Sequence, residues 1–129
     1  MRPLRHLPVY LALGLTYITL VVYECLIPHP LDLVPPFPNA DKAEHLVAFG
    51  LMMAWFGQLA VERRLRARLG LAFIALGGLI ELLQGAMALG RSMELADFAA
   101  DVLGVWLGHA ATQKGGGQLL AWWEQKTRR

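Results

Sequence analysis

Four long apolar segments fill most of this 129-residue chain, and three of them contain ionisable or amide side chains. Each segment has about 20 residues, the length that an α-helix needs to cross the hydrocarbon core of a bilayer. The chain is 56% hydrophobic and 17% charged, whereas an average soluble domain is about 45–50% apolar and about 25% charged. These features predict an all-α, polytopic membrane protein with four transmembrane helices in a bundle.

Residues that end helices separate the four predicted spans. We expect these spans at about residues 7–27, 41–61, 69–89 and 93–112. The first follows a basic start, as in a signal peptide, but its apolar run is too long for a signal h-region, so we predict a retained helix. A Pro-rich loop at 28–38, a basic turn at 62–68 and a short connection at 90–92 join the spans.

The last residues of the chain have a different composition from the spans. We divide the chain into a membrane domain at 1–113 and a cytoplasmic or interfacial tail at 114–129. Three glycines open the tail, and Leu119, Leu120, Trp122 and Trp123 follow among polar residues. That mixture is typical of a short amphipathic segment that lies in the membrane interface.

The positive charges predict the orientation of the bundle. Ten of the 12 Lys and Arg residues lie in the N-terminus, the 62–68 turn and the tail, while the two opposite loops contain only Lys42 and Arg91. Because cytoplasmic loops carry an excess of Lys and Arg, both termini are predicted to be cytoplasmic. An even number of spans gives the same arrangement.

The polar residues within the spans are the candidate functional site. Groups of this kind are rare at membrane depth and usually mark function. The candidates are Asp41, Lys42, His45, Glu81, Gln84, Arg91, Asp97 and Asp101. Within each of three helices the spacing is three or four residues, so each pair shares one helix face. We therefore predict a polar recess, formed by three helices, that opens to the extracytoplasmic side.

Four separated motifs resemble those of the VanZ-like family. They are Asp41-Lys42-Ala43-Glu44-His45, Glu81-Leu82-Leu83-Gln84, Gly90-Arg91-Ser92, and Asp97 with Asp101, Gly104 and Gly108. The family pattern commonly has Asn at the position of Asp101. The resemblance implies a multi-span protein of the bacterial inner membrane, and the name-giving member of the family is associated with teicoplanin resistance.

The chemistry of the candidates indicates recognition of a polar group at the outer leaflet. His45 and the carboxyl groups suit general acid/base chemistry, and Lys42 and Arg91 suit phosphate or carboxylate groups. Our leading hypothesis is a site that binds or modifies a lipid-linked cell-wall precursor, a lipid head group or a glycopeptide antibiotic. Two alternatives stay open: a network that only pairs helices, and half of a proton or ion pathway in a small transporter that oligomerisation completes. Whether the protein is an enzyme is also open.

Other site chemistries lack their sequence signals. The chain contains no H-E-x-x-H and no E-x-x-H, so the spacing predicts no metal site. It contains no G-x-S-x-G elbow, no phosphate loop and no dinucleotide fingerprint, so we expect no cofactor. The basic run at 62–68 is explained by membrane topology, and we expect no nucleic-acid partner.

Overall fold

The computed structural model describes residues 2–27, 40–87, 95–113 and 118–128. Its helices are α1 (Leu7–Leu26), α2 (Ala40–Leu59), α3 (Arg63–Met87), α4 (Leu95–Gln113) and α5 (Leu119–Thr127). No strand occurs in these ranges, which agrees with the all-α prediction. The Pro-rich loop at 28–38 and the 90–92 connection lie outside the described residues.

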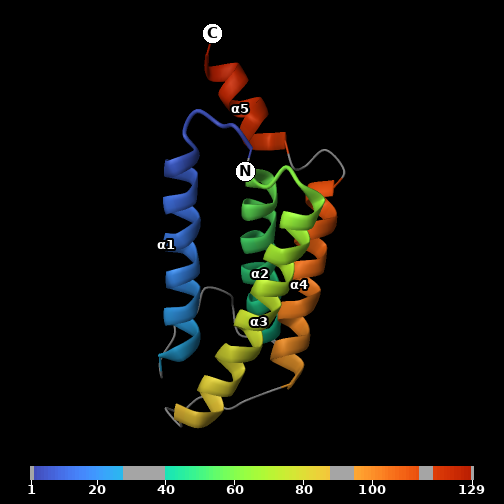
Figure 1. Ribbon diagram of the computed structural model, residues 1–129. Helices are drawn as coiled ribbons and strands as arrows, with labels where there is room; N and C mark the ends of the chain where they lie inside the picture. The colour runs from blue at the N-terminus through green and yellow to red at the C-terminus, as the bar shows by residue number, and fades with distance from the viewer. Residues whose placement is uncertain (1, 28–39, 88–94, 114–117, 129) are drawn as a thin grey trace.

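The first four helices form an elongated bundle, and α5 covers the end where the N-terminus lies (Figure 1). α2 packs against α1, α3 and α4, and its most extensive contact is with α4. The described apolar core is therefore centred on α2, with Phe49, Met52, Met53 and Leu59 fully buried. The rings of Phe56 and Phe73 join α2 to α3, with 5.5 Å between their centroids.

Close approach of α2 and α4 depends on glycines. A Cβ atom on Gly104 would overlap the carbonyl oxygen of Leu46, and one on Gly108 would overlap that of Gly50. These glycines are four residues apart, so they lie on one face of α4. The backbone of α2 occupies the space that larger side chains would need, as in other small-residue helix interfaces.

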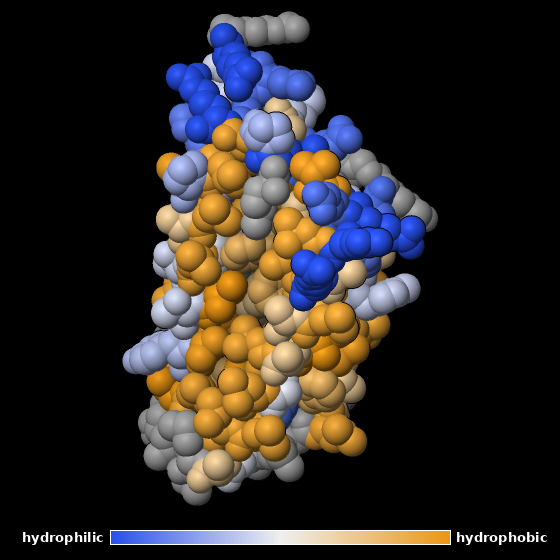
Figure 2. All heavy atoms as spheres, in the orientation of Figure 1, coloured by the Kyte–Doolittle hydropathy of each residue, from blue (hydrophilic) through white to orange (hydrophobic). Residues whose placement is uncertain are grey.

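Two of the helices are long and apolar enough to cross a membrane, namely α1 and residues Arg63–Ala86 of α3. Large hydrophobic side chains are exposed on the surface of all four long helices, including Leu13, Leu51, Leu71 and Leu103. Figure 2 shows hydrophobic residues along the helices and hydrophilic residues gathered mostly at the end with α5. Buried polar groups with an apolar exterior are expected when the surroundings are lipid.

The predicted basic turn at 62–68 is wrong, because α3 already begins at Arg63. Residues 60–62 alone connect α2 to α3. Arg, Leu and Ala are good helix formers, and the segment contains no Gly or Pro before Gly70 to stop the helix. The backbone N–H of Arg66 donates to the carbonyl of Glu62 at 3.1 Å, which extends the helical pattern back to the connection.

The tail folds back onto the start of α1. Glu124 of α5 is 5% exposed, and its two carboxylate oxygens accept hydrogen bonds from the backbone N–H groups of Arg5 and His6, at 2.8 and 2.9 Å. The N-terminus of a helix leaves N–H groups without intrahelical partners, and a carboxylate satisfies them well. Beside it, the side-chain oxygen of Gln58 accepts the N–H of Leu120 at 3.1 Å. The predicted amphipathic segment is thus a helix that packs on the bundle.

These contacts predict a pH dependence of stability. Burial raises the pKa of Glu124, but the hydrogen bonds from Arg5 and His6 outweigh burial and hold the pKa below its ordinary value of 4.5. A carboxyl group with a lowered folded-state pKa stabilises the fold above its unfolded pKa, and this contribution is lost as the pH falls through the folded pKa. The thermal midpoint in detergent, followed by circular dichroism, should therefore decline below about pH 4.5.

The variant Glu124→Gln should have a lower midpoint at neutral pH and a flatter profile in acid. The matched control is Glu62→Gln, since Glu62 is exposed in the connection between α2 and α3. If the thermal midpoint falls equally steeply below about pH 4.5 in wild type and in Glu124→Gln, Glu124 does not cause the acid destabilisation.

Candidate functional site

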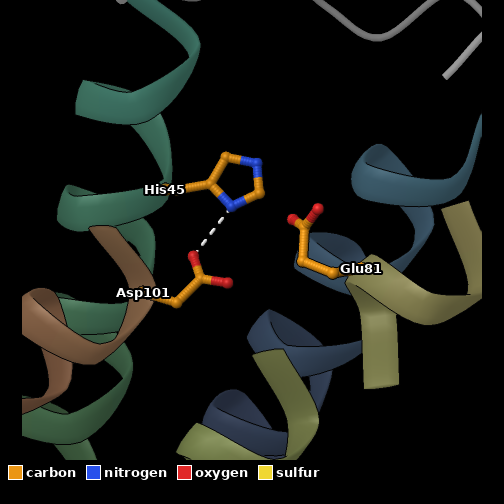
Figure 3. Close-up of side chains that lie close together, drawn as sticks. All are labelled: His45, Glu81 and Asp101. Atoms are coloured by element: carbon orange, nitrogen blue, oxygen red, sulfur yellow. Dashed lines mark hydrogen bonds and ion pairs between the residues drawn. The ribbon is translucent and has the colours of Figure 1, made fainter. Parts of the chain in front are cut away.

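Three candidate side chains meet inside the bundle, one from each of three helices. His45 of α2, Glu81 of α3 and Asp101 of α4 each place a nitrogen or oxygen atom within 4.8 Å of the others. All three are buried, with exposed fractions of 8%, 4% and 0%. Figure 3 shows the Glu81 carboxylate facing the other two side chains from the opposite helix. We call these three residues the buried triad.

His45 and Asp101 are the most tightly joined members of the triad. The Nδ1 atom of His45 lies 2.7 Å from Oδ1 of Asp101 (Figure 3). Nδ1 carries the shared hydrogen, because a carboxylate can only accept it. In the neutral imidazole Nε2 is then a hydrogen-bond acceptor, and in the protonated ring the contact is an ion pair. Asp101 thus orients the ring as a carboxylate orients a general base.

Helix geometry places the triad at one depth. His45 lies five residues after the start of α2, Asp101 six after the start of α4, and Glu81 six before the end of α3. At 1.5 Å per residue, all three are about 8–9 Å below the helix ends remote from both termini. This agrees with the prediction that the polar groups of separate helices converge near one end of the bundle.

Gly77 makes room for Asp101, a role that the sequence reasoning missed. A Cβ atom on Gly77 would lie 2.8 Å from Oδ2 and 3.1 Å from Cβ of Asp101. Gly77 is one turn before Glu81 on α3, so both residues face α4. The i, i+4 spacing of Gly77 and Glu81 in the sequence could have predicted this role, because a glycine one turn from a buried acid lets a side chain from another helix approach.

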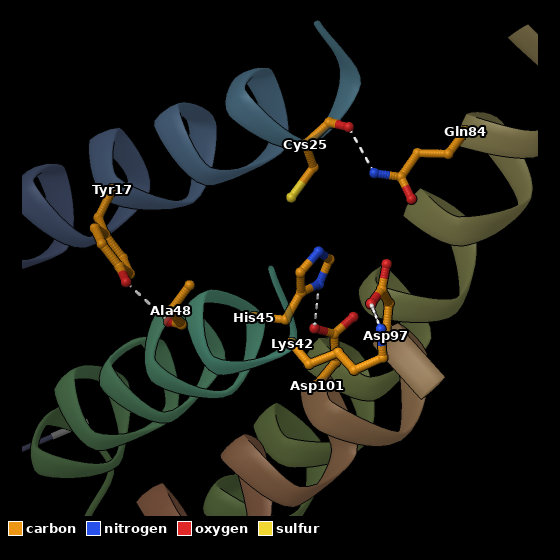
Figure 4. A network of polar contacts seen from close by, with 8 residues as sticks. All are labelled: Tyr17, Cys25, Lys42, His45, Ala48, Gln84, Asp97 and Asp101. Atoms are coloured by element: carbon orange, nitrogen blue, oxygen red, sulfur yellow. Dashed lines mark hydrogen bonds and ion pairs between the residues drawn. The ribbon is translucent and has the colours of Figure 1, made fainter. Parts of the chain in front are cut away.

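Lys42 and Asp97 form a second polar contact beside the triad (Figure 4). The Lys42 Nζ atom lies 3.7 Å from Oδ1 of Asp97, and the two side chains are 28% and 9% exposed. Each residue is about one helical turn closer to the helix ends than its triad neighbour, His45 or Asp101. Lys42 therefore provides positive charge on the side of the triad that faces the ends of the helices.

Gln84 binds the end of α1 instead of the triad. Its amide Nε2 donates to the backbone carbonyl of Cys25 at 2.6 Å (Figure 4). The last carbonyls of a helix lack intrahelical partners, so this bond satisfies one of them. The hydroxyl of Tyr17 similarly donates to the carbonyl of Ala48 at 2.9 Å, which joins α1 to α2.

Six of the eight predicted site residues are thereby placed: three in the triad, two in the adjoining ion pair and one at the end of α1. Asp41 lies in the first turn of α2, but its side chain is outside the described structure. Arg91 also lies outside the described residues.

The Asp101 side chain keeps one oxygen without a hydrogen-bond partner among the described residues. Oδ2 of Asp101 is buried and accepts no hydrogen bond there, although Asp101 is completely inaccessible to solvent. Leaving a buried polar group unsatisfied costs about 1–3 kcal/mol, and more if it is charged. Such a cost is common at sites that bind a ligand, where the ligand satisfies the group.

Comparison with known proteins finds no family model, no curated protein and no solved structure that matches this chain. The VanZ-like resemblance stays a prediction from the quoted motifs. Function is therefore inferred from the geometry of the triad and from the surface of the bundle.

Proposed function

We propose that this protein is a VanZ-like protein of the bacterial inner membrane whose buried triad recognises the polar head of an envelope-exposed substrate. The observation that carries the proposal is the convergence of His45, Glu81 and Asp101 from three helices. The substrate is a lipid-linked cell-wall precursor, a lipid head group or a glycopeptide antibiotic, and the protein binds or modifies it.

The surface of the bundle supports four membrane spans. Large apolar side chains are exposed on α2 and α4 as well as on α1 and α3, for example Val47 and Leu107. In water, apolar patches of this extent are rare on a monomer. Polar side chains of α2 and α4 are buried, among them His45, Gln58, Asp97 and Asp101, so apolar side chains make up much of the surface that would contact lipid.

Charge supports the orientation. Arg2, Arg5, Arg64 and Lys126 are among the basic residues at the end with α5, while the triad lies near the other end. By the positive-inside rule the end with α5 is cytoplasmic. The triad then lies in the outer half of the bilayer, on the side from which an outer-leaflet substrate would approach.

The chemistry of the triad favours acid/base chemistry or ligand binding over a network that only joins the helices. A helix-pairing network needs each polar group to meet another, whereas Oδ2 of Asp101 has no hydrogen-bond partner among the described residues. His45, oriented by Asp101, can exchange a proton with a substrate, and Glu81 presents a carboxyl group from the other side.

A continuous proton pathway has less support. Between the triad and the terminal end, the described centre of the bundle contains Phe49, Met52, Met53 and Phe56. Apolar side chains cannot relay protons, so a path through the described core is interrupted at the middle of the bundle.

The variant Glu81→Gln tests the function. Glutamine keeps the shape of the side chain and removes its charge and acidity. In a glycopeptide-sensitive bacterium that expresses the protein, we expect wild type to raise teicoplanin tolerance and Glu81→Gln to return it to the level of empty vector. Immunoblots of membrane fractions should show equal abundance of the two proteins.

The matched control is Glu44→Gln, the same substitution one residue from His45 on α2 at a partly exposed position. It should keep full tolerance. Loss of tolerance together with membrane abundance in Glu81→Gln would support a purely structural network, and proton flux in vesicles that depends on Glu81 would support the transporter.

A further inference from the structure

We propose that His45, Glu81 and Asp101 bind one divalent transition-metal ion, for which Zn²⁺ is the best chemical fit. The sequence spacing predicted no metal site, because the three residues come from three separate helices and form no local motif. The proposal concerns metal binding by the triad and does not depend on the identity of the envelope substrate.

The triad has the number and kind of ligands that such an ion needs. It offers one imidazole and two carboxylates, with the ligand atoms within 4.8 Å of one another. Zn–N and Zn–O bonds of about 2.0–2.1 Å in a tetrahedron place ligand atoms about 3.3 Å apart. Rotations of the Glu81 side chain supply the required contraction, and the 2.7 Å pair of His45 and Asp101 opens slightly as the ion replaces their shared hydrogen.

A second observation also points to a ligand. Oδ2 of Asp101 is fully buried, accepts no hydrogen bond within the described residues, and points toward the Glu81 side of the triad (Figure 3). Gly77 leaves room for this oxygen between α3 and α4, because a Cβ atom at this position would lie 2.8 Å from it. Oδ2 has no hydrogen-bond donor among the described residues, and a metal ion would supply its partner.

Charge balance favours a divalent cation. Two ionised carboxylates and a neutral imidazole carry two negative charges, and a divalent ion neutralises them within the bundle. Charge that is not neutralised is costly in a membrane-embedded core.

The donor set selects the ion. Imidazole suits Zn²⁺ and its transition-metal neighbours, whereas sites for Mg²⁺ and Ca²⁺ are built from oxygen atoms. The triad has no thiolate, and its three ligands match the number that catalytic zinc sites use, with the fourth position left for water or another group.

The test is a titration of the purified full-length chain in detergent after treatment with a chelator. Isothermal calorimetry with Zn²⁺ should show one ion per chain, and Co²⁺ should give the strong visible absorption of a four-coordinate site. Glu81→Gln and Asp101→Asn keep side-chain shape and should each weaken Zn²⁺ binding by at least about 10-fold.

Two control variants test whether Zn²⁺ binding requires the triad and not simply a nearby carboxylate or another histidine. Asp97→Asn removes a carboxylate one turn from Asp101, and His109→Gln removes a histidine about 12 Å further along α4. Both should bind Zn²⁺ as wild type does. The metal site is overturned if wild type does not bind Zn²⁺ stoichiometrically, or if wild type and Glu81→Gln bind Zn²⁺ with equal affinity. The first of these outcomes does not depend on whether a variant folds.

The same variants distinguish this proposal from the proposed function. Teicoplanin tolerance that is lost in Glu81→Gln without any Zn²⁺ binding by wild type would overturn the metal site alone. Stoichiometric Zn²⁺ binding without any tolerance phenotype would support the metal site and contradict the envelope function.

Discussion

Gly108→Ala is expected to lower the free energy of unfolding by about 2–3 kcal/mol, as overpacking of a tight interface does. The new Cβ would overlap the carbonyl oxygen of Gly50 and lie 2.9 Å from Cβ of Met53. The obstacle at Gly50 is backbone, so α2 and α4 must separate instead of a side chain rotating. Alanine gains only about 1 kcal/mol over glycine as a helix former, so the clash dominates. Unfolding by a denaturing detergent, followed by circular dichroism, measures the change.

Gly70→Ala is the matched control. A Cβ on Gly70 of α3 would lie 3.6 Å from Val105, an ordinary van der Waals contact, so this variant should be as stable as wild type or more stable. Gly104→Ala should resemble Gly108→Ala, since its Cβ would overlap the carbonyl oxygen of Leu46. Equal stability of Gly108→Ala and Gly70→Ala would contradict the close packing of α2 on α4.

Asp101→Ala is expected to cost about 3 kcal/mol, the lower end of the range for removing one partner of a buried ion pair. It leaves Nδ1 of His45 without its partner at 2.7 Å and removes a side chain that is completely buried. Interhelical hydrogen bonds in membranes average only about 0.6 kcal/mol, but a buried contact between two ionisable groups should exceed that mean. The measurement is again the free energy of unfolding in detergent.

The comparison with Asp97→Ala makes this prediction specific. The Lys42 side chain is 28% exposed and its Nζ atom lies 3.7 Å from Oδ1 of Asp97, so this pair is longer and more screened than the buried pair, and Asp97→Ala should cost less than Asp101→Ala. A double-mutant cycle of His45→Ala and Asp101→Ala should give a coupling energy above about 1 kcal/mol. A coupling near the membrane average, or equal costs for the two aspartates, would mean that the buried pair contributes little.

The helices could be predicted because their signals are local. Apolar runs of spanning length and the prolines after the first span are read from neighbouring residues, and the predicted bounds of α1 and α2 differ from the observed ones by at most two residues. The start of α3 could not be predicted in this way, because its arginines serve equally well as a basic turn or as the exposed first turns of a helix.

The site was predictable as a set of residues but not as a geometry. Polar residues at helical spacing indicated one polar face on each of three helices. Spacing within a helix says nothing about rotation relative to its neighbours, and that rotation brings Glu81 to His45 and Asp101 while directing Gln84 to the end of α1. The contact of Glu124 with Arg5 and His6 joins residues more than a hundred positions apart, so no local sequence pattern could predict it.

By itself, the sequence determined that the chain is helical, that its long helices have apolar exteriors, and which polar side chains lie within them, because composition and periodicity act over a few residues at a time. The tertiary structure decided the partners. Glycines let α4 pack closely on α2, and Gly77 lets α3 pack closely on α4. This packing sets which buried groups lie within hydrogen-bonding distance. It depends on helices that are far apart in the chain, so local sequence patterns do not determine it.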